Sequence, residues 1–159
     1  MTYLPEGYSL EMGSSKDKYR LIKYMKLTYQ ELFPNQLDFS HLNITVERYF
    51  TQETPIWWIK FQGKTKQLST SVACLWMGNA VDQVTGDYYG HIFLIYVTPE
   101  HRRLGLATAL IHHAQIWAKS RGDRQLGLQV FNINQPALNL YHNLGFVTKS
   151  YLMLKPLDN

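Results

Sequence analysis

The sequence is poor in cysteine and has no long apolar runs. Its 159 residues include one cysteine, Cys74, so no internal disulfide can form and a reducing compartment is expected. No apolar stretch approaches the roughly 20 residues that a membrane-spanning helix needs, and the N-terminus shows no signal-peptide pattern. We therefore expect a cytoplasmic protein with no membrane partner.

Clustered charge is also scarce. The formal net charge is +4, and the basic residues are scattered apart from the run 101–103, which reads His-Arg-Arg. Nucleic-acid-binding domains gather their positive charge into stripes or patches. The scattered charge therefore favours a small anionic ligand over nucleic acid, and a basic nucleic-acid-binding domain is the less favoured alternative. We also expect no metal site.

The composition, length and periodicity of the sequence predict a folded α+β protein. An apolar fraction of 45% and a length of 159 residues suit a single domain, residues 1–159, with its own core. Periodicity and turn residues predict helices at 16–33, 44–50, 106–121 and 134–145, and strands at 8–12, 56–61, 68–77, 91–97, 126–131 and 147–155. This order predicts a mixed central sheet flanked by helices.

The stretch 91–111 organises the chain. Residues 91–97 form an apolar run typical of a strand that is buried on both faces. The apolar residues after position 105 recur on one face of a helix. Between them lie two arginines and Gly105, where the first N–H groups of the helix have no intrahelical partner and its dipole is positive. This turn is therefore a candidate anion site, and Gly105 would let a ligand approach the backbone closely.

Two motifs in this half of the chain carry a family resemblance. The pattern R-x-x-G-x-A at 102–107 resembles the pyrophosphate-binding loop of the GNAT family, the acetyl-CoA-dependent N-acetyltransferases. The patterns N-x-x-A and L-Y-x-x-x-G-F at 134–146 resemble the second signature of that family, in the same order and at the same spacing. The resemblance is close from about His91 to the C-terminus, and in the N-terminal half it extends only to the order of elements.

The resemblance implies where acetyl-CoA would bind. In the family, the parallel strands equivalent to 91–97 and 126–131 splay apart, and the pantetheine arm of the cofactor lies in the gap. A backbone N–H near the end of the first strand polarises the thioester carbonyl; this position is Tyr96 or Val97, and Val97 is the better match. The implied cofactor-binding residues are Val97, Arg102, Arg103, Leu104, Gly105, Leu106, Ala107 and Asn134.

The resemblance also implies two catalytic side chains. Tyr141 would be the general acid that protonates the leaving thiolate, with a packed aromatic of an amphipathic helix as the alternative. His91 stands where many relatives carry a glutamate, and histidine is a competent base near neutral pH. A polar residue that merely opens a strand, with water as the base, is the alternative there. Cys74 lies in an apolar run without an activating neighbour, which favours direct transfer over an acetyl-cysteine.

Together these features predict an N-acetyltransferase that transfers an acetyl group to a primary amine in a ternary complex. The acceptor would be a small molecule or a peptide, and the sequence does not identify it. A non-catalytic sensor that binds acyl-CoA on the same fold is the alternative function. Because many relatives are dimers, a homodimer is compatible with the resemblance.

Overall fold

The computed structural model describes residues 3–63 and 70–158. The chain forms two compact units, residues 1–129 and residues 130–159. The prediction of a single domain stays a prediction. Over the described ranges, no helix is both long and apolar enough to cross a membrane.

The first unit is built on a mixed sheet with strand order β1-β2-β3-β4-β5 among the described residues. The first four strands pair antiparallel with their neighbours, whereas β4 and β5 are parallel and are joined through α3. This arrangement confirms the predicted α+β class with a mixed sheet. The strands are β1 (Tyr8–Met12), β2 (Ile56–Phe61), β3 (Thr70–Val81), β4 (Tyr88–Val97) and β5 (Leu126–Leu128).

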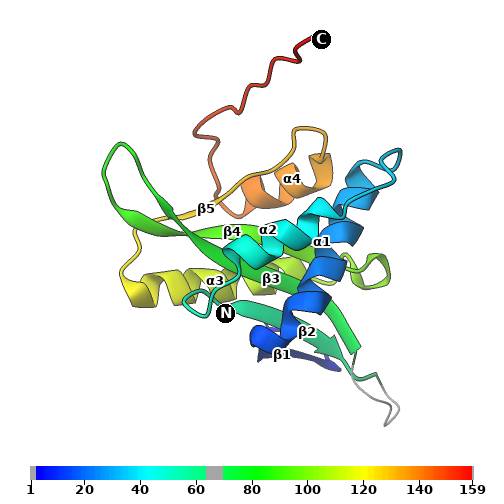
Figure 1. The fold of residues 1–159 in the computed structure, drawn as a ribbon. Helices are drawn as coiled ribbons and strands as arrows, with labels where there is room; N and C mark the ends of the chain where they lie inside the picture. The colour runs from blue at the N-terminus through cyan, green and yellow to red at the C-terminus, as the bar shows by residue number, and fades with distance from the viewer. Residues whose placement is uncertain (1–2, 64–69, 159) are drawn as a thin grey trace. The chain divides into compact units, whose positions relative to one another are not determined.

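Helices cover both faces of this sheet (Figure 1). Successive side chains of a strand point to opposite faces, and the two tryptophans of β2 show which helix lies on each. The Trp58 ring packs on Tyr24 of α1 (Lys18–Leu32), with ring centroids 5.5 Å apart. The Trp57 ring instead meets Trp117 of α3 (Leu106–Arg121) at 6.0 Å. The short helix α2 (His41–Tyr49) joins α1 on its face and contributes Leu42 and Val46 to the same core cluster.

A β-bulge in β4 positions the end of the sheet. Trp76 pairs with Leu94 and Met77 with Ile92, which leaves Phe93 as the extra residue of β4. The parallel pairing of β5 with β4 ends at Ile92 opposite Leu128, although β4 continues to Val97. The two parallel strands therefore part at the bulge, as the resemblance implied.

The second unit contains α4 (Gln135–Asn143). Asn134 caps this helix, because its side-chain oxygen accepts a hydrogen bond from the Ala137 N–H at 3.4 Å. Pro136 occupies the first turn, and Gly145 adopts a φ of 94° just after the helix ends. The predicted helix is thus confirmed.

The predicted strand at 147–155 is wrong for this structure. These residues form no helix or strand, and Val147, Tyr151 and Leu154 are 72%, 86% and 82% exposed. The segment has strand-like composition, but a strand is stable only when a neighbouring strand completes its hydrogen bonds. Composition therefore predicted a β propensity here and could not supply the partner.

The remaining boundaries differ by a few residues. The predicted strand 126–131 ends at Leu128, and the second helix begins at His41 and not at residue 44. The first residues of the predicted strand 68–77 fall outside the described residues. The end of α3 is as expected, because Gly122 caps it in the left-handed conformation with φ 90°.

Candidate functional site

The turn after β4 holds two residues in the left-handed region. Arg103 has a φ of 62° and Gly105 a φ of 79°. For a residue with a side chain this conformation costs about 1–2 kcal/mol, and such backbone strain concentrates at functional sites. The helix α3 begins directly afterwards, and its first intrahelical bond runs from the Ala109 N–H to the Gly105 carbonyl at 3.0 Å. The N–H groups that precede Ala109 in the helix therefore have no intrahelical acceptor.

This turn is also open to a ligand. A Cβ placed on Gly105 would meet no atom within 4 Å, and Leu104 is 45% exposed. The N–H of Arg102 donates to the Pro99 carbonyl at 3.4 Å, so the available backbone donors follow it in the chain. Open N–H groups in a left-handed turn at the positive end of a helix dipole form an anion-binding concavity.

The guanidinium of Arg102 faces α1. Its two terminal nitrogens donate to the two carboxylate oxygens of Glu31 at 2.6 and 2.7 Å, and its Nε donates to the Val97 carbonyl at 2.9 Å. The hydrogen bond from Arg102 lowers the pKa of Glu31, and the same bond raises the pKa of Arg102. Both groups are thus held in their charged forms.

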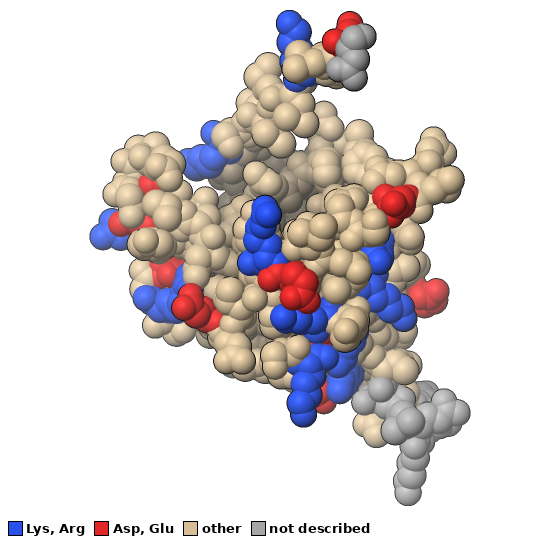
Figure 2. All heavy atoms as spheres, in the orientation of Figure 1, with Lys and Arg blue, Asp and Glu red and all other residues tan. Residues whose placement is uncertain are grey.

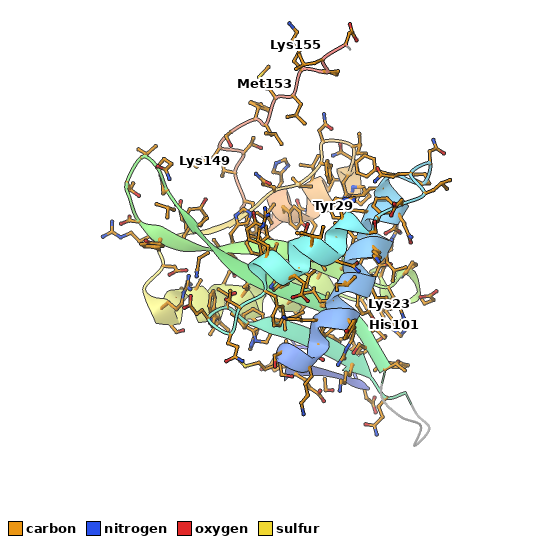
Figure 3. All side chains as sticks on the ribbon, in the orientation of Figure 1. Lys23, Tyr29, His101, Lys149, Met153 and Lys155 are labelled. Atoms are coloured by element: carbon orange, nitrogen blue, oxygen red, sulfur yellow. The ribbon has the colours of Figure 1, made fainter. Side chains whose placement is uncertain are left out.

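His101 links the turn to β1 and β2. Its Nδ1 lies 2.6 Å from the Tyr8 hydroxyl of β1, and its ring packs 5.1 Å from the ring of Phe61 in β2. Figure 3 labels His101 just after β4. The turn is therefore held by β1 and β2 through His101 and by α1 through Arg102.

The backbone of β4 beyond the bulge has an unpaired side. The N–H of Thr98 donates to the Val72 carbonyl of β3 at 2.8 Å. Successive N–H groups of an extended chain alternate in direction, so the N–H of Val97 points away from β3, and so does that of Ile95. The N–H of Tyr96 points toward β3. Of the two predicted carbonyl donors, Val97 therefore has its N–H on the side that β5 leaves open.

His91 lies before the bulge, on the same strand. Its Nδ1 is buried and has no hydrogen-bond partner among the described residues. The rings of Phe93 and Tyr89 lie 5.7 and 6.4 Å from it. Burial lowers the pKa of His91, because the imidazolium loses solvation there. The ring is thus neutral at pH 7, which is the form a base requires.

Tyr141 is the buried residue of α4 in the second unit. It is 8% exposed, and its ring packs on Phe146 at 5.8 Å. Burial raises the pKa of Tyr141 to about 12, so its hydroxyl stays protonated at neutral pH. A protonated hydroxyl suits a proton donor, and the packing equally suits a structural aromatic.

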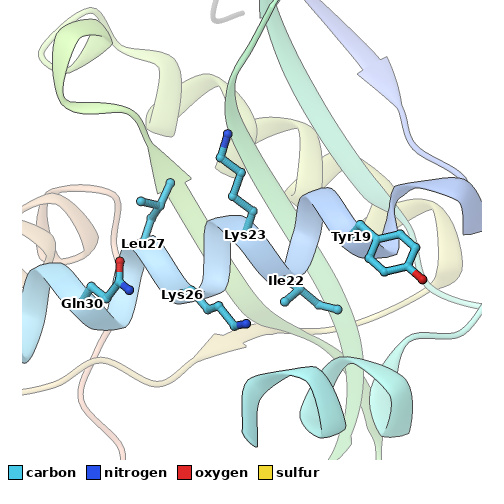
Figure 4. Close-up of a pocket in the computed structure, with 6 residues that line it drawn as sticks. All are labelled: Tyr19, Ile22, Lys23, Lys26, Leu27 and Gln30. Carbon is cyan, nitrogen blue, oxygen red and sulfur yellow. The ribbon is translucent and has the colours of Figure 1, made fainter. Parts of the chain in front are cut away.

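Two other features offer no catalytic site. Cys74 is fully buried, and burial raises the pKa of its thiol, so a nucleophilic thiolate does not form. A hollow of about 370 Å³ lies along α1 (Figure 4), and one helix alone lines it, so it cannot enclose a ligand. Its lining residues are Tyr19, Ile22, Lys23, Lys26, Leu27 and Gln30.

Sequence reasoning missed the two residues that hold the turn. Glu31 is 71 positions from Arg102, and Tyr8 is 93 positions from His101. No local pattern reports contacts over such separations. One sequence signal did exist, because Glu31 lies in the last turn of a helix, where the dipole disfavours a carboxylate.

Comparisons with known proteins find similar acetyltransferases. Streptothricin acetyltransferase of Streptomyces lavendulae is 42% identical over 52 residues, which span 33% of this chain and 28% of that protein. The ribosomal-protein-alanine N-acetyltransferase of Brucella melitensis biovar Abortus 2308 has a TM-score of 0.70 and 17% identity, covering 96% of this chain and 100% of that one. The aminoglycoside N-acetyltransferase AAC(6′)-Iy, solved with CoA, has a TM-score of 0.68 and 18% identity, covering 98% and 99%.

The last two comparisons, with identities below one in five, concern the fold alone. The alignment with the streptothricin enzyme spans less than a third of that enzyme. The family itself rests on a broader match, because the profile of the acetyltransferase (GNAT) family covers residues 21–146. The chain belongs to the acetyltransferase (GNAT) family.

Proposed function

We propose that this protein is an acetyl-CoA-dependent N-acetyltransferase that acts on a primary amine by direct transfer. The observation that carries the proposal is the open left-handed turn at Arg103 and Gly105, placed between the unpaired side of β4 and the N-terminus of α3. Acetyl-CoA supplies an acetyl group activated as a thioester. The residues below would hold that cofactor and move the protons.

The turn would bind the pyrophosphate of the cofactor. The N–H groups from Arg103 to Ala107 present several donors, and a hydrogen bond to a charged group contributes about 1.5–3 kcal/mol. Arg103 adds a guanidinium to the same turn. Arg102 keeps two of its five N–H donors after binding Glu31 and Val97, so it can still contribute one charge-assisted bond. The residues present thus fit an anionic phosphate group.

The unpaired side of β4 would hold the rest of the cofactor. The N–H groups of Ile95 and Val97 point to that side, and either can donate to a carbonyl. A fixed N–H donor that faces the reacting carbonyl stabilises the negative charge that develops on its oxygen. Asn134 would contribute as a cap of α4 whose amide also contacts the cofactor.

Two side chains would move the protons. An amine acceptor is mostly protonated at pH 7, and the neutral ring of His91 would accept its proton, directly or through one water. The hydroxyl of Tyr141 would donate a proton to the departing thiolate. The buried Cys74 thiol supports direct transfer, because no other cysteine is present to carry the acetyl group. We further propose that the acceptor is a small molecule or a peptide and that the protein works in the cytoplasm.

One experiment tests the proposal. The purified protein is incubated with acetyl-CoA and a library of primary amines, and free CoA is measured with a thiol reagent. Acetyl-CoA binding is measured in parallel by calorimetry. CoA release that depends on an amine is the expected result. Binding without release for any amine would favour the acyl-CoA sensor, and absence of binding would refute the cofactor site.

A further inference from the structure

The strongest unassigned feature is the ion pair between Glu31 and Arg102. Surface ion pairs usually contribute little, but this one has bidentate geometry, and a third bond from Nε of Arg102 reaches the Val97 carbonyl. The two carboxylate contacts measure 2.6 and 2.7 Å. The planar guanidinium is thereby fixed in position by three hydrogen bonds.

The place of Glu31 in its helix is unfavourable without this partner. It lies in the last turn of α1, where the negative end of the helix dipole repels a carboxylate and no basic residue of that turn compensates. The side chain of Glu31 is 44% exposed, so packing does not require it either. Arg102 is the group that offsets this cost.

The pair is also seated on an aromatic stack. The guanidinium carbon of Arg102 lies 5.6 Å from the centre of the Tyr96 ring, and Tyr96 packs on Tyr24 of α1 at 5.5 Å. Both rings are buried in the core between α1 and the sheet. We call Glu31, Arg102 and the Val97 carbonyl the clamp. The clamp packs against the Tyr96 ring, which restricts its movement.

The clamp holds the part of β4 that no described strand pairs with on the β5 side. Beyond Ile92 no residue of β5 pairs with β4, so one side of the strand has no ladder to fix it. Val97 is the last residue of the strand, and its carbonyl and N–H point to that same side. The bond from Arg102 takes the place of the missing ladder at this residue.

We propose that Glu31 is a positioning residue for acetyl transfer, because through Arg102 it holds the end of β4, with the N–H groups of both Ile95 and Val97, in the geometry that the reacting carbonyl requires. The proposal rests on the proposed function for its kinetic consequence. Its structural part, the restraint on β4, stands independently. A second consequence is that α1 and the cofactor turn behave as one rigid element.

The test uses Glu31→Gln, which keeps the shape of the side chain and removes its charge. Glu47→Gln is the matched control, because Glu47 forms an exposed ion pair of 3.5 Å with Lys18 between α1 and α2. Arg102→Lys keeps the charge but loses the planar fork. Each variant is compared for thermal unfolding, for acetyl-CoA dissociation constant and kcat, and for amide hydrogen exchange of Thr98 by NMR without ligand.

The amide of Thr98 reports on the end of β4, because it bonds to the Val72 carbonyl. In Glu31→Gln we expect its exchange to be roughly fivefold faster, in keeping with a partly exposed pair. We expect kcat to fall about tenfold, since small misplacements at a reacting centre are costly, while the acetyl-CoA dissociation constant changes less than about threefold. Glu47→Gln should alter none of these. Combining Glu31→Gln with Arg102→Lys should add little to the faster exchange.

Two results would overturn the proposal. The first is that Glu31→Gln matches Glu47→Gln in both exchange and kcat, which would make the pair an ordinary surface contact. Alternatively, Glu31→Gln could bind acetyl-CoA more tightly at unchanged kcat, which would show that Glu31 only competes with phosphate for Arg102. If the wild-type protein neither binds acetyl-CoA nor releases CoA, the proposed function fails, and unchanged Thr98 exchange would then refute the clamp separately.

Discussion

Replacement of Gly105 by valine tests the cofactor turn most directly. Gly105 has a φ of 79°, which a side chain adopts only at a cost of about 1–2 kcal/mol. A Cβ there would meet no atom within 4 Å, so no clash at the Cβ adds to this cost. For a chain of this size, that destabilisation lowers Tm by roughly 2–8 °C. The variant should therefore remain folded near room temperature.

Its effect on the cofactor should be larger. The added side chain would cover the face of the turn that a phosphate approaches, and the loss of one or more charge-assisted bonds costs about 1.5–3 kcal/mol each. That range corresponds to a dissociation constant for acetyl-CoA raised by roughly 10–150-fold. Isothermal titration calorimetry measures it on the folded variant.

The chain offers a matched control for this substitution. Gly122 lies at the other end of α3 with a φ of 90°, and a Cβ there would also meet nothing within 4 Å. Gly122→Val should therefore lower Tm by a similar amount and leave acetyl-CoA binding unchanged. If the two variants bind acetyl-CoA equally well, the turn does not hold the pyrophosphate and the reasoning fails.

Three further outcomes concern titratable groups. Tyr141→Phe keeps the ring and should lower kcat by about 10²–10⁴-fold at unchanged acetyl-CoA affinity; a loss of only a few-fold would leave Tyr141 as packing. In wild-type protein kcat/KM should rise with pH through a pKa below 6.5, because burial lowers the pKa of His91, and a pH–rate series on His91→Gln should lack that limb. Burial lowers the pKa of His91 and His113 below the unfolded value, so the unfolded state binds more protons and Tm should drop as pH falls below about 6.5. Scanning calorimetry of His113→Gln should show a shallower drop.

The sequence predicted those parts of the fold that local chemistry determines. The helices predicted at 106–121 and 134–145 are present with Gly122 and Asn134 as caps, because capping depends on residues within a few positions. The bulge at Phe93 was not predicted, since nothing in an apolar run indicates which residue is left unpaired. At 147–155 the opposite occurred: the sequence predicted a strand from its β propensity, but the segment has no partner strand among the described residues.

The candidate site likewise combines features that the local sequence predicts with features that it does not. The turn at 102–107 is recognisable from its own residues, because a glycine and two arginines before a helix have a local meaning. The orientation of the Arg102 side chain toward Glu31 is not recognisable from the local sequence, because it depends on how α1 packs on β4. Local motifs thus point to candidate binding residues, and tertiary contacts decide how each side chain is oriented.

The position of His91 bears on which N–H of β4 would hold the reacting carbonyl. A strand rises about 3.3 Å per residue, so Val97 lies about 20 Å from His91 along β4, whereas Ile95 lies about 13 Å away. A general base works within hydrogen-bond reach of the proton, or through one water. Of the two N–H groups on the unpaired side, that of Ile95 is therefore the better placed to share a reaction with His91, and Val97 is left to bind the cofactor arm.

Proline substitutions separate these two roles. Proline removes an N–H and is tolerated in a strand where that N–H makes no ladder bond. The N–H groups of Ile95 and Val97 both point away from β3, whereas that of Tyr96 points toward it. Ile95→Pro and Val97→Pro should therefore fold. Tyr96→Pro should be destabilised in denaturant titration by about 1–3 kcal/mol for the β3 acceptor that it leaves unsatisfied, in addition to the loss of its buried ring.

Kinetics of the two folded variants then assign the carbonyl donor. Loss of one such donor typically lowers kcat by about 10²–10³-fold. We expect that loss in Ile95→Pro, with acetyl-CoA affinity retained, and we expect Val97→Pro to weaken acetyl-CoA binding more than it lowers kcat. The opposite assignment would place the reacting carbonyl at Val97, beyond the reach of His91. The proton of the amine would then have to leave through another group, and His91→Gln should keep the wild-type pH profile.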